Sequence, residues 1–437
     1  METGIDHLVT GVTQGTGDHL GSAIMPVETW FRYQDSEWHD RRRRLVGDHT
    51  GQEPGRSRGF GHHTPTDPYH GGMPISNLHG LAAAGVSVWS DQISKKMLES
   101  GELARRVERD AVTGVTSNPT IFAGAIGGSD DYDTDLQDLK SAGLPTEEIA
   151  KTLMAGDIKR ACDVLAPVYN ATGGRDGFVS VEVSPTLAND TEATIAEARD
   201  WVKQIDRDNL FVKVPATAEG IPAIRALIGE GISVNVTLIF SLQRYGEVID
   251  AYLDGLEDLH EMGGDLSSVF SVASFFVSRF DTEADQRLDA VGSNDADDLK
   301  GKLAVANARA AYGLFLEAFS DGRFASLTDQ GGRPQKPLWA STSTKNPAYS
   351  DLLYVESLVA NDTVNTMPLE TIDAYQDHGD PEPASFDAVD IVRANDQLDK
   401  MADVGVDYDD VVATLEREGV EKFTASWLEL LEQVERA

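Results

Sequence analysis

The chain has 437 residues, and its 73 Asp and Glu against 37 Lys and Arg give a formal net charge of −36. This balance disfavours nucleic acid or an anionic membrane surface as a partner, because both bind through cationic side chains. A hydrophobic content of 41% is sufficient for a packed core, which excludes global disorder. The only cysteine, Cys162, excludes an internal disulfide framework and a cysteine-based metal site.

No run of about 18 apolar residues is present, and no basic start is followed by an apolar stretch, so neither a spanning helix nor a secretory signal is expected. We therefore expect a cytoplasmic protein. Carboxylates crowd stretches such as 129–135 and 295–298. They are interpreted either as an ordinary solvated surface or as an adaptation to high salt, where like-charge repulsion is screened.

The N-terminal 75 residues differ from the rest. Seven of the ten histidines lie there, together with the basic run 41–44, and no helix or strand period is visible. His62, His63 and His70 have no acidic or cysteine partner at ligand spacing, which disfavours a metal site. We expect residues 1–75 to be a disordered extension, or a stretch upstream of the true start, and residues 76–437 to form a single domain.

From residue 76 onwards, short β-branched runs alternate with longer helical patterns. Eight runs are predicted to be strands: 86–90, 111–116, 177–183, 209–214, 233–240, 268–276, 337–341 and 363–367. Helix-like segments between them include 94–110, 191–206, 218–230 and 243–256.

Eight such repeats predict an α/β fold, a (β/α)8 TIM barrel. The alternative is an open doubly wound sheet, but no G-x-G-x-x-G follows the first strand. Residues 117–176 look wholly helical, and 388–402 and 406–435 have apolar residues at helical spacing. The barrel is thus expected to carry inserted and C-terminal extra helices, and a C-terminal helix could pack across its mouth.

In a barrel, polar residues at the C-terminal ends of the strands form the active site. The residues at these positions are Asp91, Asn118, Glu182, Lys213, Asn235, Thr237, Ser274, Arg279, Ser341 and Lys345. The set contains no histidine, which disfavours a histidine-based triad and a metal site.

Lys213 is the most specific of these signals, because apolar residues flank it throughout 209–216. An amine that points into a barrel is buried, and burial favours the neutral, nucleophilic form. Such an amine can form an imine with a carbonyl substrate and serve as an electron sink for a carbon–carbon bond. The alternative is an edge-strand lysine whose ammonium group reaches solvent.

Carboxylates and hydroxyls near this lysine have matching roles. Asp91 is the best-placed proton-transfer group, and Glu182 with Thr237 could hold the water that imine chemistry needs. The alternatives are a helix N-cap for Asp91 and a turn role for Asn118 before Pro119.

Arg279, with Ser274 and Ser341, has the composition of an anion site, and Lys345 could add a second charge. The alternative is a surface ion pair of Arg279 with Asp281 or Glu283.

Six segments together resemble the signature motifs of transaldolases, closest to the longer bacterial enzymes of the actinobacterial kind. They are 114–122 (GVTSNPTIF), 179–185 (VSVEVSP), 209–217 (NLFVKVPAT) with 219–221, 235–241 (NVTLIFS), 274–281 (SFFVSRFD) and 339–346 (WASTSTKN). The resemblance runs in order from about residue 76 to the C-terminus.

The resemblance implies a class I aldolase-type barrel that moves a dihydroxyacetone unit between sugar phosphates, in the pentose shunt. The expected donors and acceptors are sedoheptulose 7-phosphate with glyceraldehyde 3-phosphate, and fructose 6-phosphate with erythrose 4-phosphate. It also implies no metal or organic cofactor, and a monomer or homodimer is expected.

Carried over residue by residue, the resemblance makes Lys213 the Schiff-base lysine, Asp91 the acid/base, and Glu182 a carboxylate that acts through a water with Thr237. The substrate-binding residues that it implies are Asn118, Asn235, Ser274, Arg279, Ser341 and Lys345. One departure concerns the seventh strand, where many relatives carry an arginine and this chain has 343–345 (STK).

Two alternatives remain. A fructose-6-phosphate aldolase releases free dihydroxyacetone, and such enzymes have Gln and Tyr where this chain has Glu182 and Phe276, so the pattern favours transfer. A catalytically silent sugar-phosphate-binding barrel is disfavoured because Lys213, Asp91 and Glu182 are all present.

Overall fold

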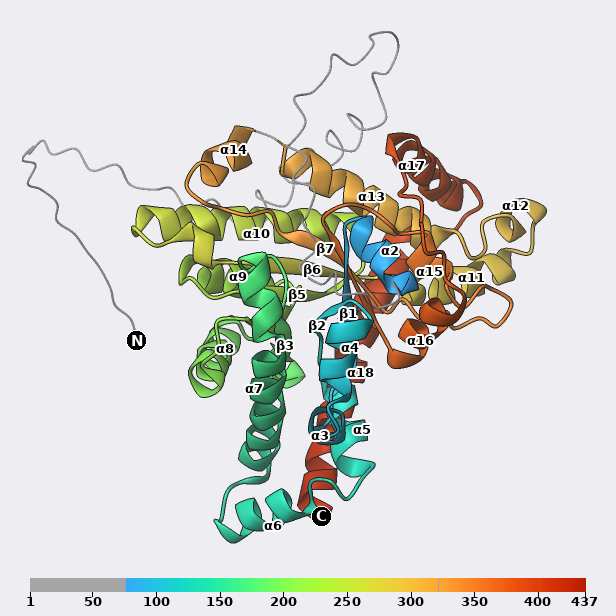
Figure 1. Ribbon diagram of the computed structural model, residues 1–437. Coiled ribbons are helices and arrows are strands. Elements are labelled where there is room, and N and C mark those ends of the chain that lie inside the picture. The colour runs from blue at the N-terminus through green and yellow to red at the C-terminus, as the bar shows by residue number, and fades with distance from the viewer. Residues whose placement is uncertain (1–75, 321) are drawn as a thin grey trace, which may run out of the picture. The chain divides into compact units, whose positions relative to one another are not determined.

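A computed structural model describes residues 76–320 and 322–437, all within one compact unit, so the extension predicted at 1–75 lies outside the described residues. Eight parallel strands pair in chain order, and β8 pairs with β1 to close the sheet (Figure 1). The strands are β1 (Val86–Ser90), β2 (Val112–Val115), β3 (Val179–Glu182), β4 (Leu210–Pro215), β5 (Val234–Ile239), β6 (Ser271–Phe276), β7 (Lys336–Ala340) and β8 (Thr363–Met367). The predicted (β/α)8 barrel is confirmed.

Every predicted strand overlaps an observed one. The largest difference is at β6, which was predicted to begin at 268. Residues Leu266–Ser268 instead form a short 3-10 helix, whose first turn is capped by the Asp265 side chain. A capped turn satisfies backbone N–H groups locally, and the ladder begins only after it.

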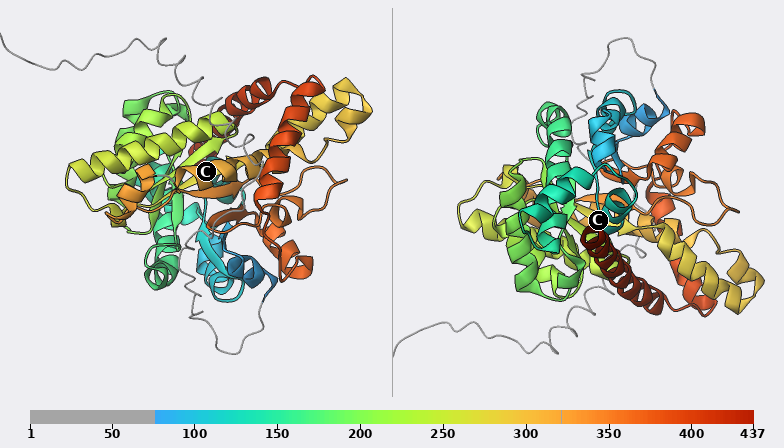
Figure 2. Two further views of the ribbon diagram at one scale, coloured as in Figure 1. Left: turned by 90° about the horizontal axis from the view of Figure 1, so that it is seen from above. Right: turned by 90° about the horizontal axis from the view of Figure 1, so that it is seen from below.

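Helices surround the barrel (Figure 2). In the described part of the chain they are α2 (Asn77–Ala83), α3 (Lys95–Glu99), α4 (Glu102–Arg109), α5 (Pro119–Gly127), α6 (Asp133–Ser141), α7 (Thr146–Thr172), α8 (Thr191–Ile205), α9 (Gly220–Gly229), α10 (Leu242–Glu261), α11 (Ser278–Val291), α12 (Asn294–Asp297), α13 (Leu303–Ala318), α14 (Gly322–Thr328), α15 (Leu353–Glu356), α16 (Leu369–His378), α17 (Ala388–Asp403) and α18 (Tyr408–Arg436). Within residues 76–320 and 322–437, no helix is long and apolar enough to cross a membrane.

The inserted and C-terminal helices are where the sequence pattern placed them. Helices α5, α6 and α7 fill the interval between β2 and β3, and α17 and α18 form the tail. Seen from below, the dark red α18 lies in front of the barrel (Figure 2, right). The single helix predicted at 94–110 is wrong, because Gly101 has a φ of 72° and separates α3 from α4.

An aromatic layer fills the barrel interior below the strand ends. Trp89 lies two residues before Asp91 and Phe211 two before Lys213, so each pair shares the inner face of its strand. The Trp89 and Phe211 rings are 6.1 Å apart, and the Phe178 ring stacks on Phe211 at 4.1 Å. Gly114 leaves room for the indole: a Cβ there would lie 2.4 Å from Trp89 Cε2.

Replacing Gly114 with Ala should therefore destabilise the barrel by about 1–3 kcal/mol, because Trp89 or the backbone must shift. The measurement is urea unfolding of Gly114→Ala beside Gly124→Ala. Gly124 lies in α5 with nothing within 4 Å of its Cβ position, so its substitution should be neutral or stabilise by up to about 1 kcal/mol. Equal effects of the two substitutions would contradict the steric role of Gly114.

A buried carboxyl ties α11 to two neighbouring segments. Asp281 Oδ1 accepts from the Ala304 backbone N–H at 2.7 Å, and its Oδ2 accepts from the Tyr354 hydroxyl at 2.9 Å. Burial raises the pKa of Asp281 to about 7, since these hydrogen bonds offset only part of the desolvation and Asp285 adds repulsion. The folded state therefore binds a proton at Asp281 more tightly than the unfolded chain does.

The contribution of Asp281 to stability is consequently fully present below about pH 4 and is lost as the pH rises through about 7. Asp281→Asn mimics the protonated group and does not titrate. The wild-type protein should lose stability relative to this variant by about 1 kcal/mol per pH unit between pH 5 and 7. Above about pH 7 the difference between their free energies of unfolding should become constant. Parallel stability curves for the two proteins, from denaturant titrations across this range, would refute the raised pKa.

Candidate active site in the barrel mouth

A buried ion pair lies at the C-terminal ends of β3 and β4. Glu182 and Lys213 are register partners, both 4% exposed, and Lys213 Nζ is 3.1 Å from Glu182 Oε2. The ammonium also donates to the Ser117 carbonyl oxygen at 3.3 Å. Burial raises the pKa of Glu182, while the charge and hydrogen bond of Lys213 oppose that shift. Lys213 thus points into the barrel, and the edge-strand alternative is wrong.

The next strand continues this polar layer. Asn235 is the register partner of Lys213; its Nδ2 donates to Ser180 Oγ at 3.0 Å and its Oδ1 accepts from Ser274 Oγ at 2.7 Å. Thr237 lies two residues further along β5 and is fully buried. Its hydroxyl has no hydrogen-bond partner among the residues that the structure describes. It therefore remains available to a small polar molecule in the mouth.

Asp91 follows β1 directly and continues its ladder, since its N–H donates to the Met367 carbonyl oxygen at 2.8 Å. Thr116 Oγ1 donates to Asp91 Oδ1 at 2.7 Å. Burial raises the pKa of Asp91, against the opposing effects of Lys213, the Thr116 hydroxyl and more distant cations. The N-cap of α3 is Ser94, whose side chain accepts from the Met97 N–H, so the helix-cap interpretation of Asp91 is wrong.

Asn118 is half-buried at the junction of β2 and α5. Its Oδ1 accepts from the Ile121 N–H at 3.0 Å, and Pro119 takes the first helical position. The side-chain carbonyl oxygen of Asn118 therefore has the local structural role that the turn interpretation predicted. The side-chain amide N–H groups are not used by this cap.

Arg279 lies in the first turn of α11, beside the mouth. Its guanidinium carbon is 5.2 Å from the Phe276 ring centroid and 5.7 Å from that of Phe423. Burial lowers the pKa of Arg279, while the charges of Glu182, Asp91 and Glu418 raise it.

The alternative ion pairs of Arg279 are wrong. Asp281 accepts hydrogen bonds from Tyr354 and Ala304, and Glu283 forms an ion pair with Arg287 at 2.8 Å. Within the described ranges, no carboxylate lies within 4.0 Å of the Arg279 guanidinium group. Two aromatic rings flank it instead, which leaves its N–H donors for an anion.

Ser341 and Lys345 follow β7 but differ in placement. Ser341 has a φ of 57°, and its Oγ is 2.9 Å from that of Ser278, which neighbours Arg279. Lys345 is exposed, and its ammonium donates to Ser343 Oγ at 2.6 Å. The structure thus places Ser341 next to the start of α11, whereas Lys345 lies in the exposed segment after β7, close enough for its charge to lower the pKa of Asp91.

Sequence reasoning missed two residues of α18 at this mouth. The Phe423 ring centroid lies 5.6 Å from Lys213 Nζ, close to the lysine most central to the site. Lys422 is exposed, and the nearby charge of Arg279 lowers its pKa, with smaller effects from burial and from Lys345. The helical period predicted that 406–435 has a buried face, but not which residues that face would meet.

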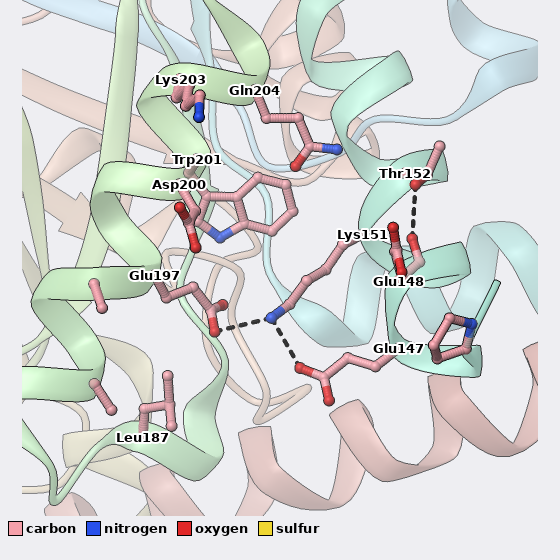
Figure 3. Close-up of a pocket in the computed structure, with 13 residues that line it drawn as sticks. Glu147, Glu148, Lys151, Thr152, Leu187, Glu197, Asp200, Trp201, Lys203 and Gln204 are labelled. Carbon is pink, nitrogen blue, oxygen red and sulfur yellow. Dashed lines mark hydrogen bonds and ion pairs between the residues drawn. The ribbon is translucent and has the colours of Figure 1, made fainter.

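A separate pocket of about 800 Å³ lies between α7 and α8 (Figure 3). Lys151 joins its two walls, 2.8 Å from Glu147 and 2.9 Å from Glu197. None of the sequence-predicted site residues lines it. The predicted residues gather instead in the barrel mouth, under α18.

Residues 88–434 match the family described as Transaldolase/Fructose-6-phosphate aldolase. A transaldolase of Thermobifida fusca is 54% identical over 363 residues, covering 82% of this chain and 97% of its own. Transaldolases of Acidothermus cellulolyticus, at 55% identity, and of Mycolicibacterium smegmatis, at 51%, each cover 82% of this chain and 96% of their own length. The chain therefore belongs to the transaldolase family, as its sequence motifs implied.

Proposed function

We propose that this protein is a transaldolase, which moves a dihydroxyacetone unit from a ketose phosphate to an aldose phosphate through an imine on Lys213. The observation that carries the proposal is the buried pair of Lys213 and Glu182, 3.1 Å apart, with Asp91 and Thr237 in the same mouth. Family membership and the curated relatives named transaldolase support the same conclusion. In this reading it serves the pentose shunt, in the cytoplasm.

Imine formation requires the neutral amine of Lys213 and loss of one water. Glu182 lies within reach of the ammonium proton, and its raised pKa favours acceptance of that proton. The unpartnered hydroxyl of Thr237 is suited to hold the water that carries the proton and later hydrolyses the imine.

Cleavage of the donor then breaks its C3–C4 bond. The electron pair moves to the iminium nitrogen, giving an enamine on Lys213, and the C4 hydroxyl proton passes to Asp91. The aldose phosphate leaves. When an acceptor aldehyde arrives, the enamine carbon attacks it and Asp91 returns the proton to the new hydroxyl. The raised pKa of Asp91 suits a group that holds and returns a proton.

The substrate phosphate is assigned to the cationic rim. Arg279 has no carboxylate partner among the described residues, and Ser341 lies beside the start of its helix. Two lysines add positive charge to this rim: Lys345 lowers the pKa of Asp91, and Lys422 lies close enough to Arg279 for its own pKa to be lowered. Asn118 and Asn235 are assigned to the hydroxyls of the three-carbon unit, and Ser274 orients the Asn235 carboxamide. These assignments need no metal or organic cofactor.

Transfer is favoured over aldolase activity by two side chains. Glu182 carries a carboxylate where the aldolase pattern has an amide. The Phe276 ring packs against Phe240 at 5.2 Å and has no hydroxyl to protonate an enamine. The intermediate is therefore expected to wait for an acceptor.

Incubation with fructose 6-phosphate and borohydride should leave a reduced three-carbon adduct on Lys213, located by peptide mass spectrometry. Lys213→Met should abolish the adduct, and Lys203→Met, on α8, should not. The reaction should be run at low and high salt, because a salt-requiring fold would otherwise look inactive. Absence of an adduct from folded wild-type protein in both conditions would overturn the proposal.

Asp91→Asn should keep the Thr116 hydrogen bond but lose the proton acceptor for cleavage. We expect kcat to fall by about 10²–10⁴-fold. The trapped species should also change from a three-carbon to a six-carbon adduct, because the imine forms but the C3–C4 bond persists. A three-carbon adduct formed at the wild-type rate would show that Asp91 is not the acid/base.

A further inference from the structure

Helix α18 is fixed to the barrel on both sides of the mouth. Near its start, the Tyr408 hydroxyl donates to Asn307 Oδ1 at 2.8 Å and accepts from the Leu242 N–H at 3.0 Å, where α10 begins. Further along, Ser426 Oγ accepts from Thr120 of α5 at 2.8 Å. A helix anchored to opposite elements crosses the opening between them.

Phe423 is the aromatic side chain that this crossing helix places over the site. It is 4% exposed, and its ring lies 5.6 Å from Lys213 Nζ and 5.7 Å from Arg279 Cζ. Gly419, one turn earlier, allows close approach: a Cβ there would lie 3.1 Å from Leu238 and 3.4 Å from the Phe240 ring. The helix is therefore packed closely against Leu238 and Phe240, and it cannot move closer to the barrel or tilt without disturbing this contact.

We propose that the Phe423 ring excludes water from the intermediate on Lys213 and thereby determines that the three-carbon unit is transferred rather than released. This inference rests on the proposed function. It assigns to α18 a role separate from that of Phe276, which lacks a proton to give. Phe423 instead limits the entry of solvent water that could protonate the enamine, whereas the one water held at Thr237 still serves the imine steps that transfer needs.

The competing reaction is defined by its atoms. A water molecule that enters the mouth gives a proton to the terminal carbon of the enamine, which becomes an iminium ion, and the hydroxide left behind is neutralised when the lysine ammonium later loses its proton. One water adds to the iminium carbon, the carbon–nitrogen bond breaks, and dihydroxyacetone leaves with the lysine amine restored. Water is the only co-reactant, so its access to the site sets the rate of release relative to transfer.

The test is a graded series at position 423: Phe423→Leu, Phe423→Val and Phe423→Ala. Dihydroxyacetone released from fructose 6-phosphate alone is compared with sedoheptulose 7-phosphate formed when erythrose 4-phosphate is added. The ratio of release to transfer should rise as the side chain shrinks, by about tenfold for Ala, which corresponds to about 1.4 kcal/mol between the two barriers. Any two variants that fold establish the direction of this trend.

Leu430→Ala is the matched control, because Leu430 is fully buried on the same helix but not among the residues described at the mouth. It should leave the release-to-transfer ratio within about twofold of wild type. An unchanged ratio across the folded 423 variants would overturn the inference, as would an equal rise in Leu430→Ala, which would indicate general loosening of α18. Failure of the proposed function is distinguishable, since wild-type protein would then trap no adduct with borohydride.

Discussion

The ion pair between Lys213 and Glu182 is the interaction on which the mouth of the barrel depends. Both charges are almost wholly withdrawn from water, and desolvation of either one alone would cost several kcal/mol. The parallel register between β3 and β4 places the two side chains next to each other. A one-residue slip of either strand would turn its charge outward and leave the other uncompensated, so the register and the pair specify each other.

Polar groups in a barrel core are tolerated only where they are satisfied. The amide of Asn235 meets this condition through Ser180 and Ser274, one residue on each side of its strand. The Thr237 hydroxyl does not meet this condition among the described residues, and it lies two residues beyond Asn235 on the same strand. Unsatisfied groups in an otherwise satisfied layer are expected where a substrate or water completes the set. Below it, the packing of Trp89 against Phe211 contributes stability that offsets the cost of burying this polar layer.

The sequence predicted the barrel and the identity of its inner polar residues because both depend on short-range pattern. Alternation fixes which strand residues point inward, as for Asn235 and Thr237, and eight repeats fix the closure. Interactions set by distant segments were not accessible. The side-chain partner of Asp281 is Tyr354, far along the chain, whereas the sequence suggested its near neighbour Arg279. The break at Gly101 was missed because a helical period does not report a positive φ.

The same limit explains why the sequence indicated that a C-terminal helix could cover the mouth but not which residues of α18 would meet the site. Its apolar spacing identified a buried face, but Phe423 meets Lys213 only after about two hundred residues of chain have closed the barrel. A barrel presents its strand ends to solvent, so a reaction that must exclude water needs a cover that the eight repeats do not supply. A helix appended after the eighth repeat can be anchored at both rims without disturbing any strand. In this chain the anchored helix places an apolar ring, rather than another polar group, against the only lysine in the inner layer of β4. That choice of side chain suits an intermediate that has to outlast the departure of the first product.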